Sequence, residues 1–261
     1  MLRSLYTAAT GMEAQQLKMD VIAHNLANAS TAGFKKERAD FEDLLSETIH
    51  GAGAPDPRGG TEPAPLQVGL GVRSGTTTRS MAQGDRINTQ NQYDLSIDGA
   101  GYFRVQRPNG DIAFTRAGNF RVDQTGRLVT QNGETIEPAI TVPPETLSVT
   151  VQADGTVLAT LPGRTDPQQL GQLELTNFTN PGALLAIGNN LYQPSAASGQ
   201  EVQQKPGEQG MGTLSQGFLE SANVKAVEEM IDMITTQRSY EMNSKVITTA
   251  DQMLQRLTNL R

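Results

Sequence analysis

The N-terminal stretch of the chain determines the fold class, because its apolar side chains repeat as those of a long helix do. Residues 1–29 read MLRSLYTAATGMEAQQLKMDVIAHNLANA. Spacings of three and four residues alternate along an almost wholly apolar row, the heptad pattern of a helix that packs on another helix. The row consists of Leu2, Leu5, Ala9, Met12, Gln16, Met19, Ala23 and Leu26. A long helix is therefore predicted here, and Gly33 and Phe34 are expected to end it.

The C-terminal stretch has the same character. Residues 224–260 contain neither proline nor glycine, and apolar side chains recur there every seven residues. Asn223 is expected to cap the N-terminus of this second helix, with Glu228 and Glu229 in its early turns. The recurring row and its flanking residues are Ala226, Met230, Met233, Tyr240, Ile247, Ala250, Leu254 and Leu257.

Between these helices the sequence changes to short apolar runs separated by turn dipeptides. Asp98-Gly99, Asn109-Gly110 and Asp154-Gly155 are examples within residues 93–161, and the spacing predicts a meander of antiparallel strands. Glycine and proline are dense in residues 51–65 and exclude a regular element there. The predicted fold is therefore α+β, with an antiparallel β body inserted between two terminal helices that form an intermolecular coiled-coil assembly.

These patterns divide the chain into five segments. A helix of 29 residues spans roughly 44 Å, and a hairpin of two such helices leaves much apolar surface in water, so the termini are expected to pack on other copies. The segments are an N-terminal assembly helix (1–35), an extended, loop-rich connecting domain (36–92), an outer β domain (93–195), a return connection (196–222) and a C-terminal assembly helix (223–261).

Composition and charge exclude several classes of protein. The 261 residues carry a net charge of −7 and include no cysteine, which rules out disulfides and thiolate metal sites. Residues 41–223 hold 11 basic and 19 acidic side chains, whereas a nucleic-acid-binding protein needs a basic face. Residues 1–6 do not begin a Sec signal peptide, because no long apolar stretch follows the single basic residue.

Catalytic chemistry has little support in the sequence. Neither His24 nor His50 belongs to a cluster with metal-ligand spacing, and no cofactor is expected. Asp94 and Asp98 share one side of an expected strand and are the remaining candidates for the paired carboxylates that cleave glycans. Solvated charges on a strand face are the simpler interpretation. A glycan-binding or glycan-cleaving protein and a monomeric binding module remain alternatives to a structural polymer.

Two motifs, one near each end, resemble the signatures of the bacterial flagellar rod and hook axial proteins. The first is NLANASTAGFK at residues 25–35, and the second is MIDMITTQRSYEMNSK at residues 230–245. Residues 98–103 and 114–120 also look like this family, so the resemblance covers nearly the whole chain. The motif residues are Asn25, Asn28, Thr31, Gly33, Phe34, Gln237, Arg238, Tyr240 and Asn243.

The resemblance implies a structural subunit and not an enzyme. Chain length and the segment from Phe41 to Leu66 favour the distal rod over the proximal rod or the hook. Copies would stack helically into a hollow, rigid drive shaft that transmits motor torque to the hook, spanning the periplasm in the flagellar basal body. The implied assembly interface consists of Leu2, Leu5, Met12, Met19, Leu26, Met230, Met233, Tyr240, Ile247, Leu254 and Leu257.

The same resemblance implies the partners of the chain. They are copies of itself, the proximal rod proteins, the hook protein, the surrounding L- and P-ring proteins and the flagellar type III export apparatus. Export by that apparatus leaves the subunit uncleaved, which agrees with the missing Sec signal. The subunit travels unfolded or nearly so, and termini that become ordered only on assembly suit that route.

Overall fold

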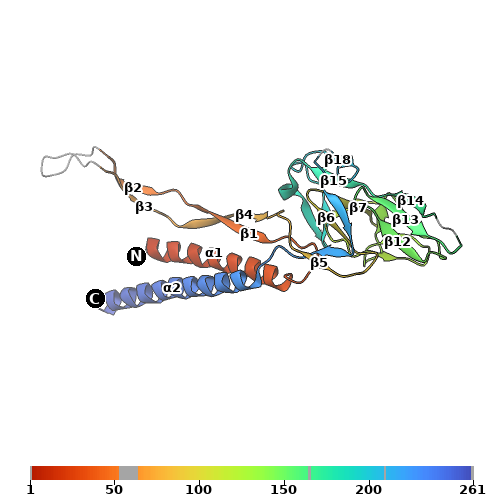
Figure 1. Cartoon of the computed structure of the whole chain (residues 1–261). Coiled ribbons are helices and arrows are strands. Elements are labelled where there is room, and N and C mark those ends of the chain that lie inside the picture. Colours follow the sequence, from red (N-terminus) through yellow and green to blue (C-terminus); the bar gives the residue numbers. More distant parts are fainter. Residues whose placement is uncertain (1, 53–63, 164–165, 209, 260–261) are drawn as a thin grey trace. The chain divides into compact units, whose positions relative to one another are not determined.

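The computed structural model describes residues 2–52, 64–163, 166–208 and 210–259 (Figure 1). The chain forms two compact units. The first contains residues 1–27, 37–78 and 225–261, and the second contains residues 28–36 and 79–224. The two expected assembly helices therefore share a unit with most of the connecting segment, and the expected β domain shares the other with the return connection.

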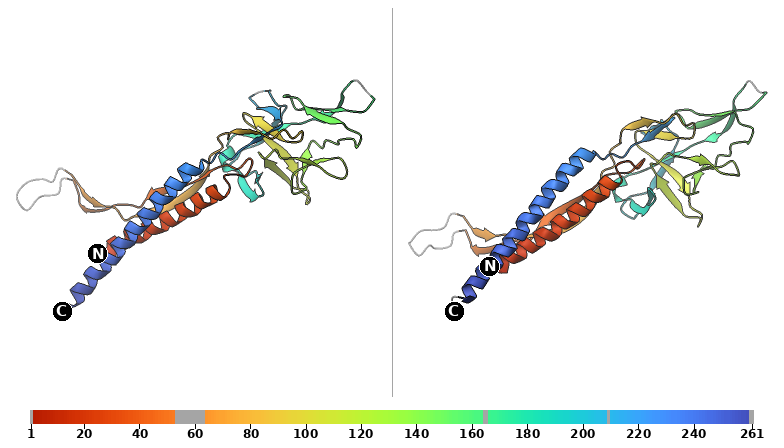
Figure 2. Two further views of the ribbon diagram at one scale, coloured as in Figure 1. Left: turned by 60° about the horizontal axis from the view of Figure 1, so that its bottom comes forward. Right: turned by 90° about the horizontal axis from the view of Figure 1, so that it is seen from below.

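Two helices dominate the first unit. α1 (Leu2–Ala27) and α2 (Ala226–Asn259) lie side by side and run antiparallel (Figure 2). Both were predicted, although α1 ends two residues before the expected boundary. Gly33 adopts the predicted left-handed conformation (φ 72°), but it lies beyond the end of α1.

A two-stranded ribbon accompanies α1 in the same unit. β1 (Glu37–Asp43) pairs with β4 (Val72–Arg79), and β2 (Glu47–His50) pairs with β3 (Leu66–Val68). β1 contacts α1, and Arg3 of α1 forms an ion pair with Glu47 at 2.7 Å. Sequence patterning predicted no strands here, because the strands are rich in polar side chains and contain no fully buried residue that would mark a core-facing side. Of the proline- and glycine-rich segment, residues 53–63 lie outside the described part.

The second unit is built on antiparallel strands. Its largest sheet has nine strands, with the order β16-β17-β8-β7-β11-β10-β9; β15 pairs with β7, and β18 pairs with β15. The strands of this sheet are β7 (Tyr102–Gln106), β8 (Ile112–Thr115), β9 (Arg121–Val122), β10 (Leu128–Val129), β11 (Thr135–Glu137), β15 (Leu175–Phe178), β16 (Leu185–Gly188), β17 (Leu191–Gln193) and β18 (Glu201–Gln204).

Three smaller sheets complete this unit. β12 (Ser148–Val151), β13 (Thr156–Thr160) and β14 (Gln168–Gln172) form a three-stranded sheet, and a short 3₁₀ helix η1 covers Pro181–Ala183. The return connection contributes β19 (Thr213–Gln216), which pairs with β6 (Leu95–Asp98), and β20 (Phe218–Glu220), which pairs with β5 (Arg86–Asn88). The return connection therefore supplies partners for strands that lie far earlier in the chain.

The predicted turns are confirmed, but the predicted meander is wrong. The glycines of the three turn dipeptides named above, Gly99, Gly110 and Gly155, all have positive φ. So do Gly126 and Gly133, in the dipeptides Thr125-Gly126 and Asn132-Gly133 of the same region. Strand order departs from a meander because β7 pairs with β11 and β15, and β8 pairs with β17. Short-range turn chemistry reveals the hairpins, whereas long-range pairing depends on which faces the core buries.

The core of the second unit consists of aliphatic and aromatic side chains from its sheets. The ring of Phe103 meets that of Phe120 edge to face, with centroids 5.0 Å apart. A second cluster gathers Phe114, Phe178 and Tyr192 around Tyr102. In the described residues, neither α1 nor α2 is apolar enough along its length to cross a membrane.

Gly118 is the tightest glycine of this core and allows a clean test of the fold. A Cβ at this position would lie only 1.6 Å from the backbone oxygen of Leu95. We expect Gly118→Ala to lower the free energy of unfolding by about 3 kcal/mol, because overpacking a filled site shifts the backbone. Urea unfolding followed by circular dichroism measures this. Gly69→Ala, which adds a Cβ in open space, serves as the control; equal stability of both variants would contradict the packing.

Candidate functional site: the helix faces and a buried ion cluster

Polar and small side chains join α1 to α2. Asn25 is buried and its amide nitrogen donates hydrogen bonds to the backbone oxygen of Glu37 (2.8 Å) and to the carboxylate of Glu229 (3.2 Å). Its amide oxygen accepts the backbone N–H of Glu37 at 2.9 Å. One asparagine of the N-terminal motif therefore ties both helices to β1. A buried polar pair of this kind can fix the register of two helices.

Close approach of the helices continues at Gly11. A Cβ at Gly11 would lie 2.9 Å from the amide nitrogen of Asn243, the last motif asparagine. Ala8 of α1 and Thr236 and Ala250 of α2 are also buried. These contacts between the helices involve small and polar side chains, and Val21 and Ile22 are the large apolar side chains that α1 buries.

The apolar row predicted on α1 lies beside this contact and not in it. Met12, Met19 and Leu26 are half-buried, as is Leu5, while Gln16 and Ala23 of the same row are exposed. The buried side chains of α1 are Ala8, Ala14, Val21, Ile22 and Asn25. The heptad pattern thus identified a real apolar face but missed the face that the subunit buries by itself. The side chain of Leu2 lies outside the described residues.

The residues predicted on α2 differ in their exposure. Met233, Ile247 and Leu254 are half-buried, whereas Met230 and Tyr240 are exposed. The motif residues Gln237 and Arg238 are also exposed, and Asn243 is half-buried. The structure does not describe the side chain of Leu257.

A second apolar face of α2 points away from α1. Successive residues of a helix are rotated by about 100° about its axis. The side chains of this second face therefore lie opposite Glu229, Thr236 and Asn243, which face α1. We call this surface the outer α2 face; it consists of Val227, Ile231, Ile234, Arg238, Met242, Lys245 and Thr249, all exposed. At its C-terminal edge Met242, Val246 and Met253 line an apolar hollow of about 450 Å³.

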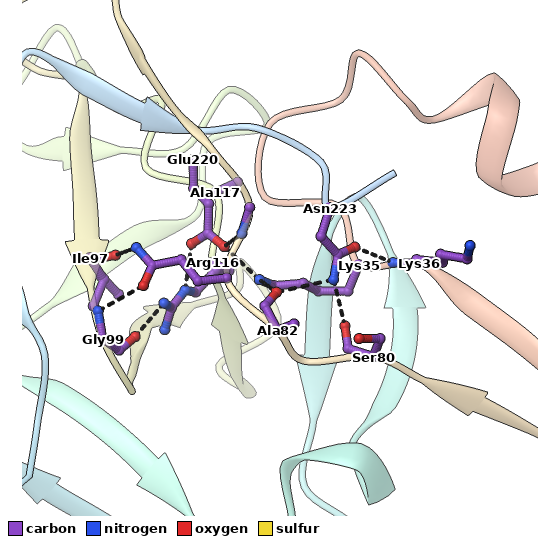
Figure 3. A network of polar contacts seen from close by, with 12 residues as sticks. Lys35, Lys36, Ser80, Ala82, Ile97, Gly99, Arg116, Ala117, Glu220 and Asn223 are labelled. Atoms are coloured by element: carbon purple, nitrogen blue, oxygen red, sulfur yellow. Dashed lines mark hydrogen bonds and ion pairs between the residues drawn. The ribbon is translucent and has the colours of Figure 1, made fainter. Parts of the chain in front are cut away.

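The second unit contains a buried ion cluster around Glu220 (Figure 3). Its carboxylate accepts hydrogen bonds from Lys35 Nζ at 2.5 Å, from Arg116 Nε at 2.7 Å and from the backbone N–H of Gly84 at 3.0 Å. Lys35 and Glu220 are each 1% exposed. Arg116 also donates to the backbone oxygens of Gly99 and Gly101. Charged groups buried this deeply require such complete pairing.

Burial and the attraction between opposite charges shift the pKa values of the cluster residues in opposite directions. Burial raises the pKa of Glu220, but the positive charges of Arg116 and Lys35 outweigh it and hold the pKa of this carboxyl below its ordinary value. Burial lowers the pKa of Lys35, against the opposing attraction of Glu220. Glu220 is therefore held as a carboxylate that bridges segments distant in sequence.

Asn223 extends this network instead of capping α2. Its side-chain oxygen accepts the backbone N–H of Lys36 at 2.6 Å, and its nitrogen donates to the backbone oxygens of Ser80 and Ala82 at 2.9 and 3.0 Å. The expected N-cap is therefore wrong: α2 begins at Ala226, and the oxygen of Lys225 accepts the N–H of Glu229. The Asn223 amide therefore bonds to two segments distant in sequence, which no local pattern reveals.

The remaining motif residues of the first signature lie in the second unit. Gly33 donates its N–H to the backbone oxygen of Glu220 at 2.8 Å, and Phe34 is buried. Asn28 and Thr31 line a polar cleft of about 390 Å³ together with Asn189 and Asn190. Lys35, Arg116 and Glu220 were not selected as site residues from the sequence, because isolated charges give no sign that they will be buried.

The carboxylates considered for catalysis are engaged in structural contacts. Asp94 is buried and accepts hydrogen bonds from the side chains of Thr89 and Asn91. Asp98 forms an ion pair with Arg86 at 2.9 Å. Among the described residues, no three histidine or acidic side chains come together as metal ligands do.

Family models of flagellar proteins match three parts of the chain. The model described as "Flagella basal body rod protein" matches residues 5–35, and "Flagellar basal body rod FlgEFG protein C-terminal" matches residues 215–260. "Flagellar hook protein FlgE/F/G D1 domain" matches residues 96–159, within the strands of the second unit. The matched parts include both sequence motifs.

Individual proteins are similar over the whole chain. A flagellar basal-body rod protein FlgG of Buchnera aphidicola subsp. Schizaphis graminum is 47% identical over 260 residues, covering 100% of both chains. FlgG of Caulobacter vibrioides is 47% identical over 261 residues, again covering both chains fully. A flagellar hook protein FlgE of Borreliella burgdorferi is 42% identical over 130 residues, which are 49% of this chain and 29% of its own.

These similarities define the class of the protein, an axial component of the bacterial flagellum. The chain belongs to the family of flagellar basal-body rod proteins, and the relatives quoted above that match its full length carry the name FlgG. It is therefore a structural subunit of the rod, located in the flagellar basal body.

Replacement of Glu220 tests the buried ion cluster. We expect Glu220→Gln to lower the free energy of unfolding at pH 7 by about 3–5 kcal/mol, because Lys35 and Arg116 would remain buried without their counter-charge. Urea unfolding measures the change, with the exposed Glu208→Gln as control. A loss no larger than that of the control would contradict the assigned role.

The same cluster predicts a pH dependence. Because the folded-state pKa of Glu220 is lowered, its contribution to stability is complete above its unfolded pKa of about 4.3 and disappears as the pH falls through the folded value. Below about pH 4 the wild-type protein should lose stability more steeply than Glu220→Gln. Parallel pH profiles of the two proteins would show that the carboxylate is not held ionised.

Proposed function

We propose that the chain polymerises with copies of itself into the distal part of the flagellar rod, a hollow and rigid shaft that transmits torque to the hook. The observation that carries this proposal is the surface of α2, which has one face towards α1 and a second apolar face in solvent. A helix with apolar side chains on opposite faces removes all of them from water only when both faces are covered. The described chain covers one of them.

Export without a cleaved signal agrees with the same picture. The subunit would pass through the flagellar type III export apparatus in an unfolded or partly folded state. Its terminal helices contact each other mainly through small and polar groups, so isolated subunits gain little from pairing them. Absence of cysteine avoids unwanted disulfides in an oxidising periplasm.

The remaining partners follow from position along the shaft. Proximal rod proteins would bind one end of the polymer and the hook protein the other. The acidic β body would face the surrounding L- and P-rings, where residues 41–223 with their excess of eight negative charges resist non-specific adhesion. We also propose that the chain has no enzymatic activity, a proposal supported by the structural contacts of Asp94 and Asp98.

A charge in the apolar row of α1 tests assembly. Leu26 is half-buried, and an aspartate there would place an unpaired charge against covered apolar surface. We expect Leu26→Asp to be exported but absent from isolated rods, with cells that do not swim. Leu26→Met, which keeps the volume and the apolar character, should support normal swimming. Normal motility of Leu26→Asp would contradict the proposal.

Segment 46–66 tests how rigidity arises. It contains β2 and ends at Leu66, the first residue of its partner β3, and its sequence includes prolines, which restrict the backbone. We propose that it packs between neighbouring subunits and stiffens the shaft. Deletion of residues 46–66 should give rods that bend or have altered length in electron micrographs. Straight rods of unchanged length would rule out this role.

A further inference from the structure

We propose that the outer α2 face binds the outer face of α1 in a second copy of this chain, antiparallel, with Lys245 opposite Glu13 and Arg238 opposite Asp20. The proposal rests on the polymer proposed above and names the surfaces that build it. Three observations carry it: unpartnered charges of opposite sign, their equal spacing, and complementary side-chain sizes.

The outer α2 face is basic as well as apolar. Arg238 and Lys245 lie on the midline of this face, seven residues apart, with Ile231, Ile234 and Met242 around them. Both charged side chains are exposed. Within the described residues, neither belongs to an ion pair of its own subunit. A binding partner must therefore offer apolar contact and negative charge together.

The outer face of α1 has the matching charges. Glu13 and Asp20 are exposed and also lie seven residues apart. At about 100° per residue, both point away from Gly11, which faces α2 within the subunit. Neither forms an ion pair among the described residues. We call this surface the outer α1 face; it consists of Tyr6, Ala9, Glu13, Gln16, Asp20, Ala23 and Ala27.

Polarity of the polymer sets the direction of packing. Copies that repeat along one shaft share one orientation, so α1 of one copy runs antiparallel to α2 of its neighbour, as it does to its own α2. Two residue pairs with equal spacing can then meet in one register, which places Lys245 against Glu13 and Arg238 against Asp20. A shift by one heptad, about 10.5 Å, leaves at most one pair.

Side-chain size supports this register. The proposed register places Ala27 opposite Ile231 and Ala23 beside Ile234. Small side chains of α1 would therefore pack against large side chains of α2 in the neighbouring copy. Tyr6, which is 59% exposed, falls at the end that holds the apolar hollow lined by Val246 and Met253. Alternation of small and large side chains across facing helices allows close packing.

Disulfide trapping tests the register directly, because the chain contains no cysteine. Ala9→Cys and Thr249→Cys would be produced as separate chains in cells that hold no other copy, so that only contacts between copies can link them. The two positions lie opposite each other in the proposed register. We expect oxidised, isolated rods to contain the linked dimer. Ala9→Cys with Met242→Cys, one heptad out of register, should not link, because a disulfide needs Cα atoms about 4.4–6.8 Å apart.

Charge reversal tests the ion pairs independently of cysteine chemistry. Glu13→Lys and Lys245→Glu should each lower the amount of chain in isolated rods by about tenfold, because like charges then face each other at every subunit. The double variant should restore assembly towards the wild-type amount. Double and single variants that assemble equally poorly would overturn the pairing.

The outcomes separate this inference from the proposed function. Rods that contain both cysteine variants but no linked dimer would overturn the contact while the chain remains a rod subunit. Absence of the wild-type chain from isolated rods would instead contradict the proposed function. Linkage to a different protein at position 249 would show that the outer α2 face binds another partner and would also overturn the contact.

Discussion

The contact between the two terminal helices is the constraint on which the first unit depends. Asn25, Glu229 and the Gly11–Asn243 approach hold α1 against α2 through polar and small groups. Such a contact specifies register better than it provides apolar burial. Apart from Val21 and Ile22, the large apolar side chains whose exposure is described on both helices remain half-buried or exposed. A subunit built in this way has a defined helical hairpin but leaves apolar surface exposed to water. This combination suits a polymer better than a monomer.

The second unit depends on a different constraint. Glu220, near the end of the return connection, and Asn223, just after it, form hydrogen bonds with the loop that follows α1 and with the segment that precedes β5. Charges buried with complete pairing hold these backbone segments in one arrangement. In a shaft under torque, segments that lead to and from the assembly helices must transmit force without rearranging. The ion cluster gives this part of the second unit that rigidity.

Local features of the fold were predictable from sequence, and long-range ones were not. The heptad rows predicted both helices, and turn glycines such as Gly110 and Gly126 predicted hairpins, because both patterns depend on neighbouring residues alone. Pairing of β8 with β17 joins residues far apart in the chain and follows from the core as a whole. Asn223 illustrates the same limit, since it fits a cap by its position but bonds to distant backbone.

The candidate assembly residues divide in a similar way. Periodicity selected Met12, Met19 and Leu26 as an apolar row, and the structure leaves that row half-buried beside the helix contact. Periodicity could not select Val227, Ile231 and Ile234. The charged residues Arg238 and Lys245 lie on the same face of α2, so the sequence shows no continuous apolar row there. Buried ions such as Lys35 and Arg116 were missed because burial of a charge depends on partners that only the fold brings together.

Immunogold electron microscopy of purified hook–basal bodies, with an antibody against this chain, tests the central claim most directly. A subunit of the distal rod should be labelled on the shaft between the rings and the hook. Label on the hook, or only next to the inner membrane, would contradict the distal position. Absence of label from the whole structure, with the protein found free in cell extracts, would contradict polymerisation itself.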